Sequence, residues 1–249
     1  MKIVYKSLAV VTACLLLAAC GGPKVPPKST AEKYFLEGER FYESGLFVDA
    51  IASWEKVRDT FYSPELSMLA ELKIAETYFI TERYEEASAA YADFLQQHPN
   101  DFRTPLILYR LGLSYYRQIL AADRDQTNTE NALRAFQQLV NRFPEDPNAE
   151  EAGYYIIRCK TRLAEHEVYV GRYYMKMEHY QPAIRRLEAV LKAYPDYYYR
   201  DEVYYFLGKA YFETGQPEKT RSIFKQLFEQ FPGSDYLEDA QELLAELNG

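Results

Sequence analysis

The sequence predicts an all-α fold of five stacked helix pairs, with a long helix between the third and fourth pairs. The first observation is a small residue followed three positions later by an aromatic one, a pattern that recurs at intervals of 37, 37, 59 and 37 residues. The five occurrences are Gly38 and Phe41, Ala75 and Tyr78, Gly112 and Tyr115, Gly171 and Tyr174, and Gly208 and Tyr211. A period in the thirties is typical of stacked helix hairpins. The second observation is that no segment shows the sustained period-two alternation of a strand.

Each repeat carries the marks of two helices. Twelve positions after the first small residue, four repeats have another small residue, and a large residue follows four positions later. The small residues are Ala50, Ala87, Ala183 and Thr220, and the large ones are Trp54, Tyr91, Leu187 and Phe224. Two helices approach closely where both side chains are small, so we expect the hairpins to close at these small pairs.

Prolines mark where the helices begin and end. Pro99, Pro144, Pro195 and Pro232 occupy one repeat position, and Tyr62 stands there in the first repeat. Proline lacks the backbone donor and clashes with the preceding turn, so it ends the second helix. Pro64 and Pro105 each follow a capping residue and fit the first helical position.

The interval of 59 divides into two insertions. Eight extra residues lengthen the hairpin of the third repeat around residues 121–129, and fourteen more precede the fourth repeat. Fourteen residues form about four helical turns, or about 21 Å. An apolar stripe at helical spacing crosses them, formed by Ala149, Ala152, Ile156, Cys159, Leu163, His166, Val170 and Tyr173. We therefore expect one long helix over residues 147–178, which joins repeats one to three (residues 29–146) to a second part (residues 147–249).

The cysteine and histidine residues do not indicate a chemical site. Cys159 is the single cysteine left after residues 1–19 are removed and Cys20 is modified, and it lies on the apolar stripe, so we interpret it as a small core residue. His166 lies on the same stripe and fits a packed histidine better than a ligand. The three histidines are far apart in sequence, and no zinc, Walker, GxGxxG or GxSxG motif is present. We expect no enzyme activity, no metal and no cofactor.

The N-terminus resembles a bacterial lipoprotein signal. Lys2 and Lys6 precede a short apolar run, and Leu17-Ala18-Ala19-Cys20 resembles a lipobox. Residues 1–19 are then a signal peptide, and Cys20 carries the lipid that anchors the chain to a membrane. Gly21 follows where an aspartate would favour the inner membrane, so we expect the periplasmic face of the outer membrane. Residues 20–28 contain three prolines and predict an extended tether.

The net charge disfavours two classes of partner. Removal of the signal takes away two lysines and no acidic residue, so the mature chain has 27 basic and 37 acidic residues, a net charge of −10. An acidic surface disfavours nucleic acid and anionic lipid headgroups. The predicted membrane link is therefore the lipid.

The repeat pattern resembles the tetratricopeptide repeat. Leu111-Gly112-Leu113-Ser114-Tyr115 and Leu207-Gly208-Lys209-Ala210-Tyr211 match its most recognisable stretch. Together with the lipobox, the tether, the long interruption and Arg185-Arg186-Leu187-Glu188, this solenoid resembles the BamD family, also called YfiO or ComL. These are outer-membrane lipoproteins of the machinery that inserts β-barrel proteins.

That resemblance implies a scaffold with several partners. They are the periplasmic domains of the barrel insertase, unfolded barrel precursors and other assembly lipoproteins. It implies that the C-terminal repeats meet the insertase through Arg186, beside Arg185, and that the N-terminal repeats contact precursors. For the groove of those repeats, the helix aromatics Tyr34, Phe41, Tyr78 and Tyr109 are candidates, although some of them must belong to the core.

Two interpretations stay open for the partner-binding residues. Arg186 can instead be a solvated arginine paired with Glu188 or Glu202. Tyr197, Tyr198 and Tyr199 form either a partner-facing patch or a packed turn against Tyr204 and Tyr205. An alternative function is also open: a repeat lipoprotein that acts as a pilotin for a secretin or as a regulator of cell-wall synthesis.

Overall fold

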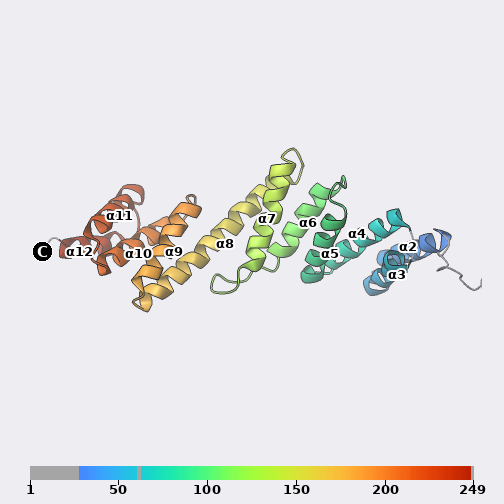
Figure 1. Cartoon of the computed structure of the whole chain (residues 1–249), viewed down its shortest axis with the longest axis horizontal. Helices are drawn as coiled ribbons and strands as arrows, with labels where there is room; N and C mark the ends of the chain where they lie inside the picture. Colours follow the sequence, from blue (N-terminus) through green and yellow to red (C-terminus); the bar gives the residue numbers. More distant parts are fainter. Residues whose placement is uncertain (1–27, 61–62, 248–249) are drawn as a thin grey trace, which may run out of the picture. The chain divides into compact units, whose positions relative to one another are not determined.

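The described part of the chain is helical throughout, and no strand occurs in it. The computed structural model describes residues 28–60 and 63–247, so the predicted signal peptide, Cys20 and nearly all of the tether lie outside the described residues. The helices are α2 (Lys28–Glu43), α3 (Phe47–Thr60), α4 (Pro64–Ile80), α5 (Tyr84–Gln97), α6 (Thr104–Tyr116), α7 (Thr127–Arg142), α8 (Ala149–Lys176), α9 (Tyr180–Ala193), α10 (Arg200–Glu213), α11 (Pro217–Gln230) and α12 (Leu237–Glu246) (Figure 1). This architecture confirms the predicted all-α repeat fold.

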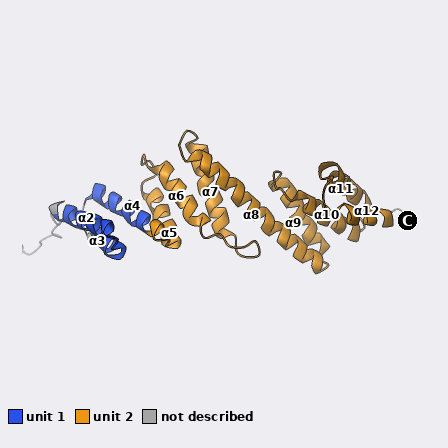
Figure 2. Ribbon diagram, turned by 180° about the vertical axis from the view of Figure 1, so that it is seen from behind, with its two compact units in different colours: residues 1–77 blue, residues 78–249 orange. Residues whose placement is uncertain are grey.

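The chain forms two compact units, residues 1–77 and 78–249 (Figure 2). In the first unit α2 packs along α3, and Trp54 of α3 is fully buried. Lys73 of α4 bridges to α2 through an ion pair with Glu39 (3.1 Å from Nζ to Oε2), and its Nζ lies 5.6 Å from the Tyr42 ring centroid. The division that the sequence predicts at residues 146 and 147 stays a prediction.

The hairpins close where a large side chain lies against a glycine. A Cβ atom on Gly208 would lie 2.2 Å from the Phe224 ring, and one on Gly112 would lie 2.5 Å from the Phe136 ring. The same relation joins Gly38 to Trp54, at 2.5 Å, and Gly171 to Leu187, at 2.9 Å. The sequence pattern predicts the closest approach between two small residues, whereas these glycines admit the large side chain of the second helix.

The turns of the first, second, fourth and fifth hairpins share one geometry. The N–H of Leu46 donates to the carbonyl of Phe41 (2.8 Å), and that of Gln216 donates to the carbonyl of Tyr211 (2.9 Å). These bonds, with a residue of positive φ between the helices, define a Schellman C-cap. Glycine takes that position in the first and fifth repeats, at Gly45 and Gly215. The second and fourth repeats place Glu82 (φ 60°) and Glu178 (φ 58°) there.

The helix ends agree with the sequence patterns. Helices α5, α7, α9 and α11 each end two residues before the expected proline, and α3 ends two residues before Tyr62. Helix α4 begins at Pro64, and α6 begins one residue before Pro105. Helix α8 has 28 residues, and both its beginning and its end lie within two residues of the predicted bounds. The separate helix α12 was missed; its Ala240 is fully buried against the C-terminal core.

Helix α8 changes its buried side along its length. Ala152, Cys159 and Leu163 are buried in the first half, as the stripe predicts. In the second half the buried residues are Ala164, Val168 and Gly171. The helix packs first on α7 and then on α9 and α10, so its inner side shifts. The stripe was therefore wrong at Tyr173, which is 51% exposed.

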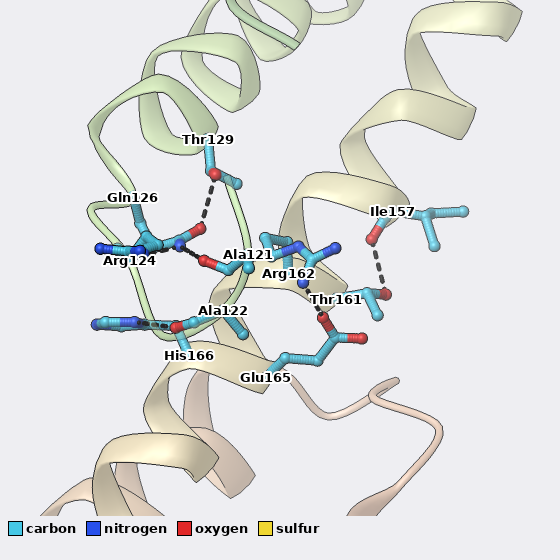
Figure 3. A network of polar contacts seen from close by, with 10 residues as sticks. All are labelled: Ala121, Ala122, Arg124, Gln126, Thr129, Ile157, Thr161, Arg162, Glu165 and His166. Carbon is cyan, nitrogen blue, oxygen red and sulfur yellow. Dashed lines mark hydrogen bonds and ion pairs between the residues drawn. The ribbon is translucent and has the colours of Figure 1, made fainter. Parts of the chain in front are cut away.

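Cys159 and His166 have structural roles. Cys159 is fully buried, and burial raises the pKa of its thiol to about 12, so it stays protonated. His166 lies beside the loop between α6 and α7, where its Nδ1 is 2.7 Å from the carbonyl oxygen of Ala122 (Figure 3). A carbonyl only accepts, so Nδ1 carries the proton of this bond. The lengthened hairpin is thereby tied to α8.

The loop is also held from within by Gln126. Its Nε2 donates to the carbonyl oxygens of Ala121 (2.9 Å) and Arg124 (3.0 Å), and its Oε1 accepts a bond from the Thr129 hydroxyl at 2.8 Å (Figure 3). Gln126 is itself buried, so these bonds satisfy an amide that water does not reach. The inserted residues therefore form an ordered extension of the third repeat.

We expect Gly208→Ala to lower the free energy of unfolding by about 1–3 kcal/mol, because the added methyl group overlaps the Phe224 ring. Gly153→Ala is the matched control. A Cβ at Gly153 of α8 meets nothing within 4 Å, so alanine there should stabilise the helix by about 0.5–1 kcal/mol. Urea denaturation of both variants measures the difference, and equal effects would contradict the close-contact model.

We expect Glu82→Gly to raise the stability by about 1 kcal/mol, because a non-glycine residue is strained at positive φ. The control is Glu76→Gly, an exposed position inside α4, where glycine should cost about 1 kcal/mol of helix stability. Thermal unfolding should therefore move in opposite directions for the two variants. A loss of stability in both would show that the Glu82 backbone is unstrained.

Candidate docking surface on the α8–α9 hairpin

Arg186 lies at the centre of an exposed seam between α8 and α9. Its Nη1 lies 2.9 Å from both carboxylate oxygens of Glu167, and the two side chains are 46% and 23% exposed. The partners considered from the sequence are engaged elsewhere. Glu188 accepts a bond from the Tyr211 hydroxyl, and Glu202 pairs with Arg172 at 2.6 Å. Arg186 is therefore paired, as one of the two interpretations expected, but its partner is Glu167 and not Glu188 or Glu202.

The ion pair leaves donors on Arg186 unused. Within the described residues, its Nε and Nη2 have no hydrogen-bond acceptor. A guanidinium presents five N–H groups in a planar fork that suits a carboxylate. An exposed ion pair contributes about 0–1 kcal/mol to stability. Glu167 therefore orients the guanidinium of Arg186, and the remaining N–H groups stay available to a partner.

A pocket of about 370 Å³ opens along the same seam. Its lining comes from α8 and from the end of α9 with the following turn: Ile157, Lys160, Thr161, Lys192, Ala193, Tyr194, Pro195, Asp196 and Tyr197. Lys160 precedes Glu167 by seven residues, and Ala193 follows Arg186 by seven. Seven residues are about two helical turns, so the pocket and the ion pair share one face of the hairpin. We call this face, including Tyr198 and Tyr199, the docking face.

The sequence pattern does not predict this pocket. Ile157 is 64% exposed although it is apolar, and Ile156 beside it belongs to the predicted stripe. The one sign of the pocket in the sequence is therefore an apolar residue, Ile157, that lies outside the apolar stripe. This sign does not predict a pocket by itself, because the other half of the lining comes from α9 and the turn after it.

The docking face is basic in a chain whose net charge is −8. Arg185, Lys160 and Lys192 are exposed and have no ion pair among the described residues. Arg185 and Lys192 are also seven residues apart and share one side of α9. Positive charge that the fold leaves unbalanced favours an acidic partner surface.

The three tyrosines between α9 and α10 do not share one role: one is packed in the turn and two are exposed. Tyr197 is 6% exposed and packs in the C-terminal core with Tyr204 and Tyr205. Burial, with the nearby Glu165, raises the pKa of Tyr197 above its usual range. Tyr198 is 81% exposed, and its ring centroid lies 5.0 Å from that of Tyr199. Tyr197 is therefore a core residue, and the other two are available to a partner.

The N-terminal groove candidates also differ from one another. Tyr109 is only 7% exposed, packs on Phe136 with centroids 6.2 Å apart, and is therefore a core residue rather than a groove residue. Tyr34 is half-buried with Lys56 5.0 Å from its ring centroid, and Phe41 is half-buried in the same unit. Tyr78, in the other unit, is half-buried beneath Arg83 at 4.5 Å. These three stay candidates.

The described residues contain no candidate metal site and no candidate membrane span. No cluster of three or more histidine, cysteine, aspartate or glutamate side chains there has a geometry able to hold a metal ion. Among the same residues, every helix is too short or too polar to span a bilayer.

Comparison with known proteins identifies the family. Residues 27–223 match the model of the family YfiO, described as outer membrane lipoprotein. The chain belongs to this family. The matched residues include α8, α9 and the whole docking face, so the long helix lies within the part of the chain that the family model matches.

Individual relatives agree over nearly the full length. The outer membrane protein assembly factor BamD of Neisseria meningitidis serogroup A is 27% identical over 94% of this chain and 94% of its own. The protein of the same name from Rickettsia prowazekii is 26% identical over 98% of each chain. Among solved structures, the TPR2AB-domain:pHSP90 complex of yeast Sti1 is 16% identical, with a TM-score of 0.42 over 88% of this chain and 86% of that one.

Tyr197→Ala should lower the free energy of unfolding by about 3 kcal/mol, since it empties a buried aromatic site. Tyr198→Ala should change it by less than about 0.5 kcal/mol, as exposed substitutions usually do. Chemical denaturation monitored by circular dichroism compares the two. Similar values would mean that the run acts as one unit, contrary to its division into a buried and an exposed part.

Proposed function

We propose that this chain is a non-catalytic scaffold lipoprotein of the machinery that assembles outer-membrane β-barrel proteins. The observation that carries the proposal is the near full-length similarity to relatives named outer membrane protein assembly factor BamD. The scaffold docks on the periplasmic domains of the barrel insertase, works beside other assembly lipoproteins and helps deliver barrel precursors. In this proposal a lipid on Cys20 holds the body at the periplasmic face of the outer membrane, after residues 1–19 are removed.

The docking face is the proposed contact with the insertase. Arg186 offers Nε and Nη2 to a carboxylate of the partner, and Arg185, Lys160 and Lys192 surround it with positive charge. The pocket beside Ile157 accepts an apolar side chain of that partner. Tyr198 and Tyr199 extend the contact, since tyrosine gives a large contact area at low entropic cost.

The N-terminal repeats, residues 29–146, are the proposed site for precursors, with Tyr34, Phe41 and Tyr78 as candidates. Tyr34 and Phe41 in one unit and Tyr78 in the other each expose part of a half-buried ring, and such amphipathic rings suit the exposed aromatic residues of an unfolded barrel strand. Residues 147–249, the long helix with repeats four and five, then hold the body on the insertase.

Arg186→Glu should weaken capture of the insertase by at least about tenfold, because it places a second negative charge beside Glu167 where the partner offers a carboxylate. Detergent extraction, capture of the full chain and quantification of the insertase measure the effect. Lys225→Glu makes the same charge change at an exposed position of α11, outside the docking face, and should leave the yield unchanged.

Two results would contradict the proposal in different ways. An unchanged insertase yield for Arg186→Glu, with the variant still folded, would remove Arg186 from the contact. Recovery of a secretin and no barrel insertase with the unsubstituted chain would favour the alternative, a pilotin for secretin assembly.

A further inference from the structure

The two insertions that lengthen the third interval meet at the middle of α8. The first lies in the loop between α6 and α7, residues 117–126, and the second forms part of α8 itself. We call residues 117–126 the inserted loop. The carbonyl oxygen of Ala122 in this loop is 2.7 Å from Nδ1 of His166 in α8 (Figure 3). Among the described residues this is the one hydrogen bond between the inserted loop and α8.

The apolar core is divided at the same part of α8. Ala152 and Cys159 belong to a cluster formed with α6 and α7, whereas Ala164 and Val168 belong to a cluster formed with α9, α10, α11 and α12. Leu163 lies between these pairs, and although it is buried it is part of neither cluster. The two clusters are therefore separate, and the change occurs between Cys159 and Ala164, where α8 passes from α7 to α9.

The inserted loop is itself attached to the helices before it. Nε2 of Gln118 donates to the carbonyl oxygen of Tyr84 in α5 at 3.0 Å and to that of Ser114 in α6 at 3.0 Å. At the other end of the loop, the buried amide of Gln126 bonds to two carbonyl oxygens of the loop. The loop is thus held at both ends. A hydrogen bond from it to His166 therefore restrains α8 relative to α5 and α6.

His166 precedes the residue that orients Arg186. Glu167 is the next residue of α8, and its carboxylate lies 2.9 Å from the Arg186 guanidinium of α9. Successive residues of an α-helix are about 100° apart around its axis, so His166 faces the inserted loop while Glu167 faces α9. A rotation of α8 about its axis would move both side chains together. The bond to Ala122 therefore also fixes the direction of Glu167.

We propose that His166 is a positioning residue of the docking face. Through its bond to Ala122, the inserted loop holds α8 where the two apolar clusters separate. This restraint keeps Glu167 and Arg186 in the geometry that a partner meets. The expected effect on capture of the insertase rests on the proposed function. The expected effect on the arrangement of α7 and α9 along α8 does not, so the two effects are measured separately.

The deciding variant is His166→Phe, which keeps a planar ring of similar size and removes the N–H donor. His166→Asn is the rescue variant, since the side-chain amide of asparagine supplies an N–H close to the position of Nδ1. His179→Phe is the matched control, because His179 is exposed and its side chain forms no hydrogen bond among the described residues. Circular dichroism checks the fold of each variant. Should His166→Phe fail to fold, His166→Ala replaces it.

The distance between two spin labels measures the restraint on α8. The labels are attached to Gln138→Cys in α7 and Ala189→Cys in α9, both at exposed positions. Cys159 is fully buried and Cys20 carries the proposed lipid, so neither takes up a label. For His166→Phe, the distances in the full chain in detergent should show a minor arrangement raised by about two- to tenfold, the effect of losing one hydrogen bond. The rescue and control variants should match the unsubstituted histidines.

Capture of the insertase, measured as for Arg186→Glu, tests the effect on the docking face. His166→Phe should lower the yield by about two- to tenfold, and His166→Asn should restore it. Failure of the chain with both native histidines to capture the insertase would contradict the proposed function, and the distances would then decide whether the inserted loop restrains α8.

Three results would overturn the proposal. Unchanged distances for His166→Phe would show that the bond to Ala122 does not restrain α8. Altered distances with an unchanged yield would show that the restraint does not position the docking face. An equal loss of yield for His179→Phe would show that the substitution acts without the inserted loop.

Discussion

The contact between a glycine in one helix and a large side chain in the next sets the geometry of most hairpins in this chain. At Gly38, Gly112 and Gly208 a ring occupies the space of the absent Cβ, and at Gly171 the Leu187 side chain does so. The two helices can then lie closer than their other side chains would allow. That spacing decides which residues of each helix are covered, because a neighbour at close range buries a narrow stripe and leaves the remaining surface to solvent or a partner.

Helix α8 shows the consequence most clearly. It packs on α7 along its first half and on α9 and α10 along its second, and its buried residues change from Ala152 and Cys159 to Val168 and Gly171. Because 28 residues exceed what one repeat can cover, each half leaves a different side uncovered. The docking face includes Ile157 and Lys160 of the first half, and a hollow of about 680 Å³ between α8 and α10 includes Tyr169 and Tyr173 of the second half. The docking face thus depends on the fourteen extra residues that precede the fourth repeat.

Periodicity predicted most of the fold, since it depends on interactions that are local in sequence. The proline stops, the long helix and the burial of Cys159 follow from spacing alone. Prediction failed where the register between helices decides the outcome. Glu167 pairs with Arg186 because α8 and α9 are antiparallel at a particular offset, and Tyr197 separates from Tyr198 because the turn packs on α10. The two pockets depend on lining residues from two helices, so no single stretch of sequence contains their signal.

The docking face is basic although the chain is acidic overall. Lys160, Lys192 and Arg185 have no ion pair among the described residues, and Arg186 keeps free donors despite its bond to Glu167. Repulsion by the acidic remainder disfavours an acidic partner over most of the surface, so a basic face of this kind determines where such a partner binds. The geometry of this face depends on how α8 lies against α9, because the two helices supply Glu167 and Arg186. The contact between Gly171 and Leu187 joins the same two helices and resists their movement, since close-packed interfaces deform little. The spacing of the docking face is therefore fixed by the packing of the hairpin before any partner is present.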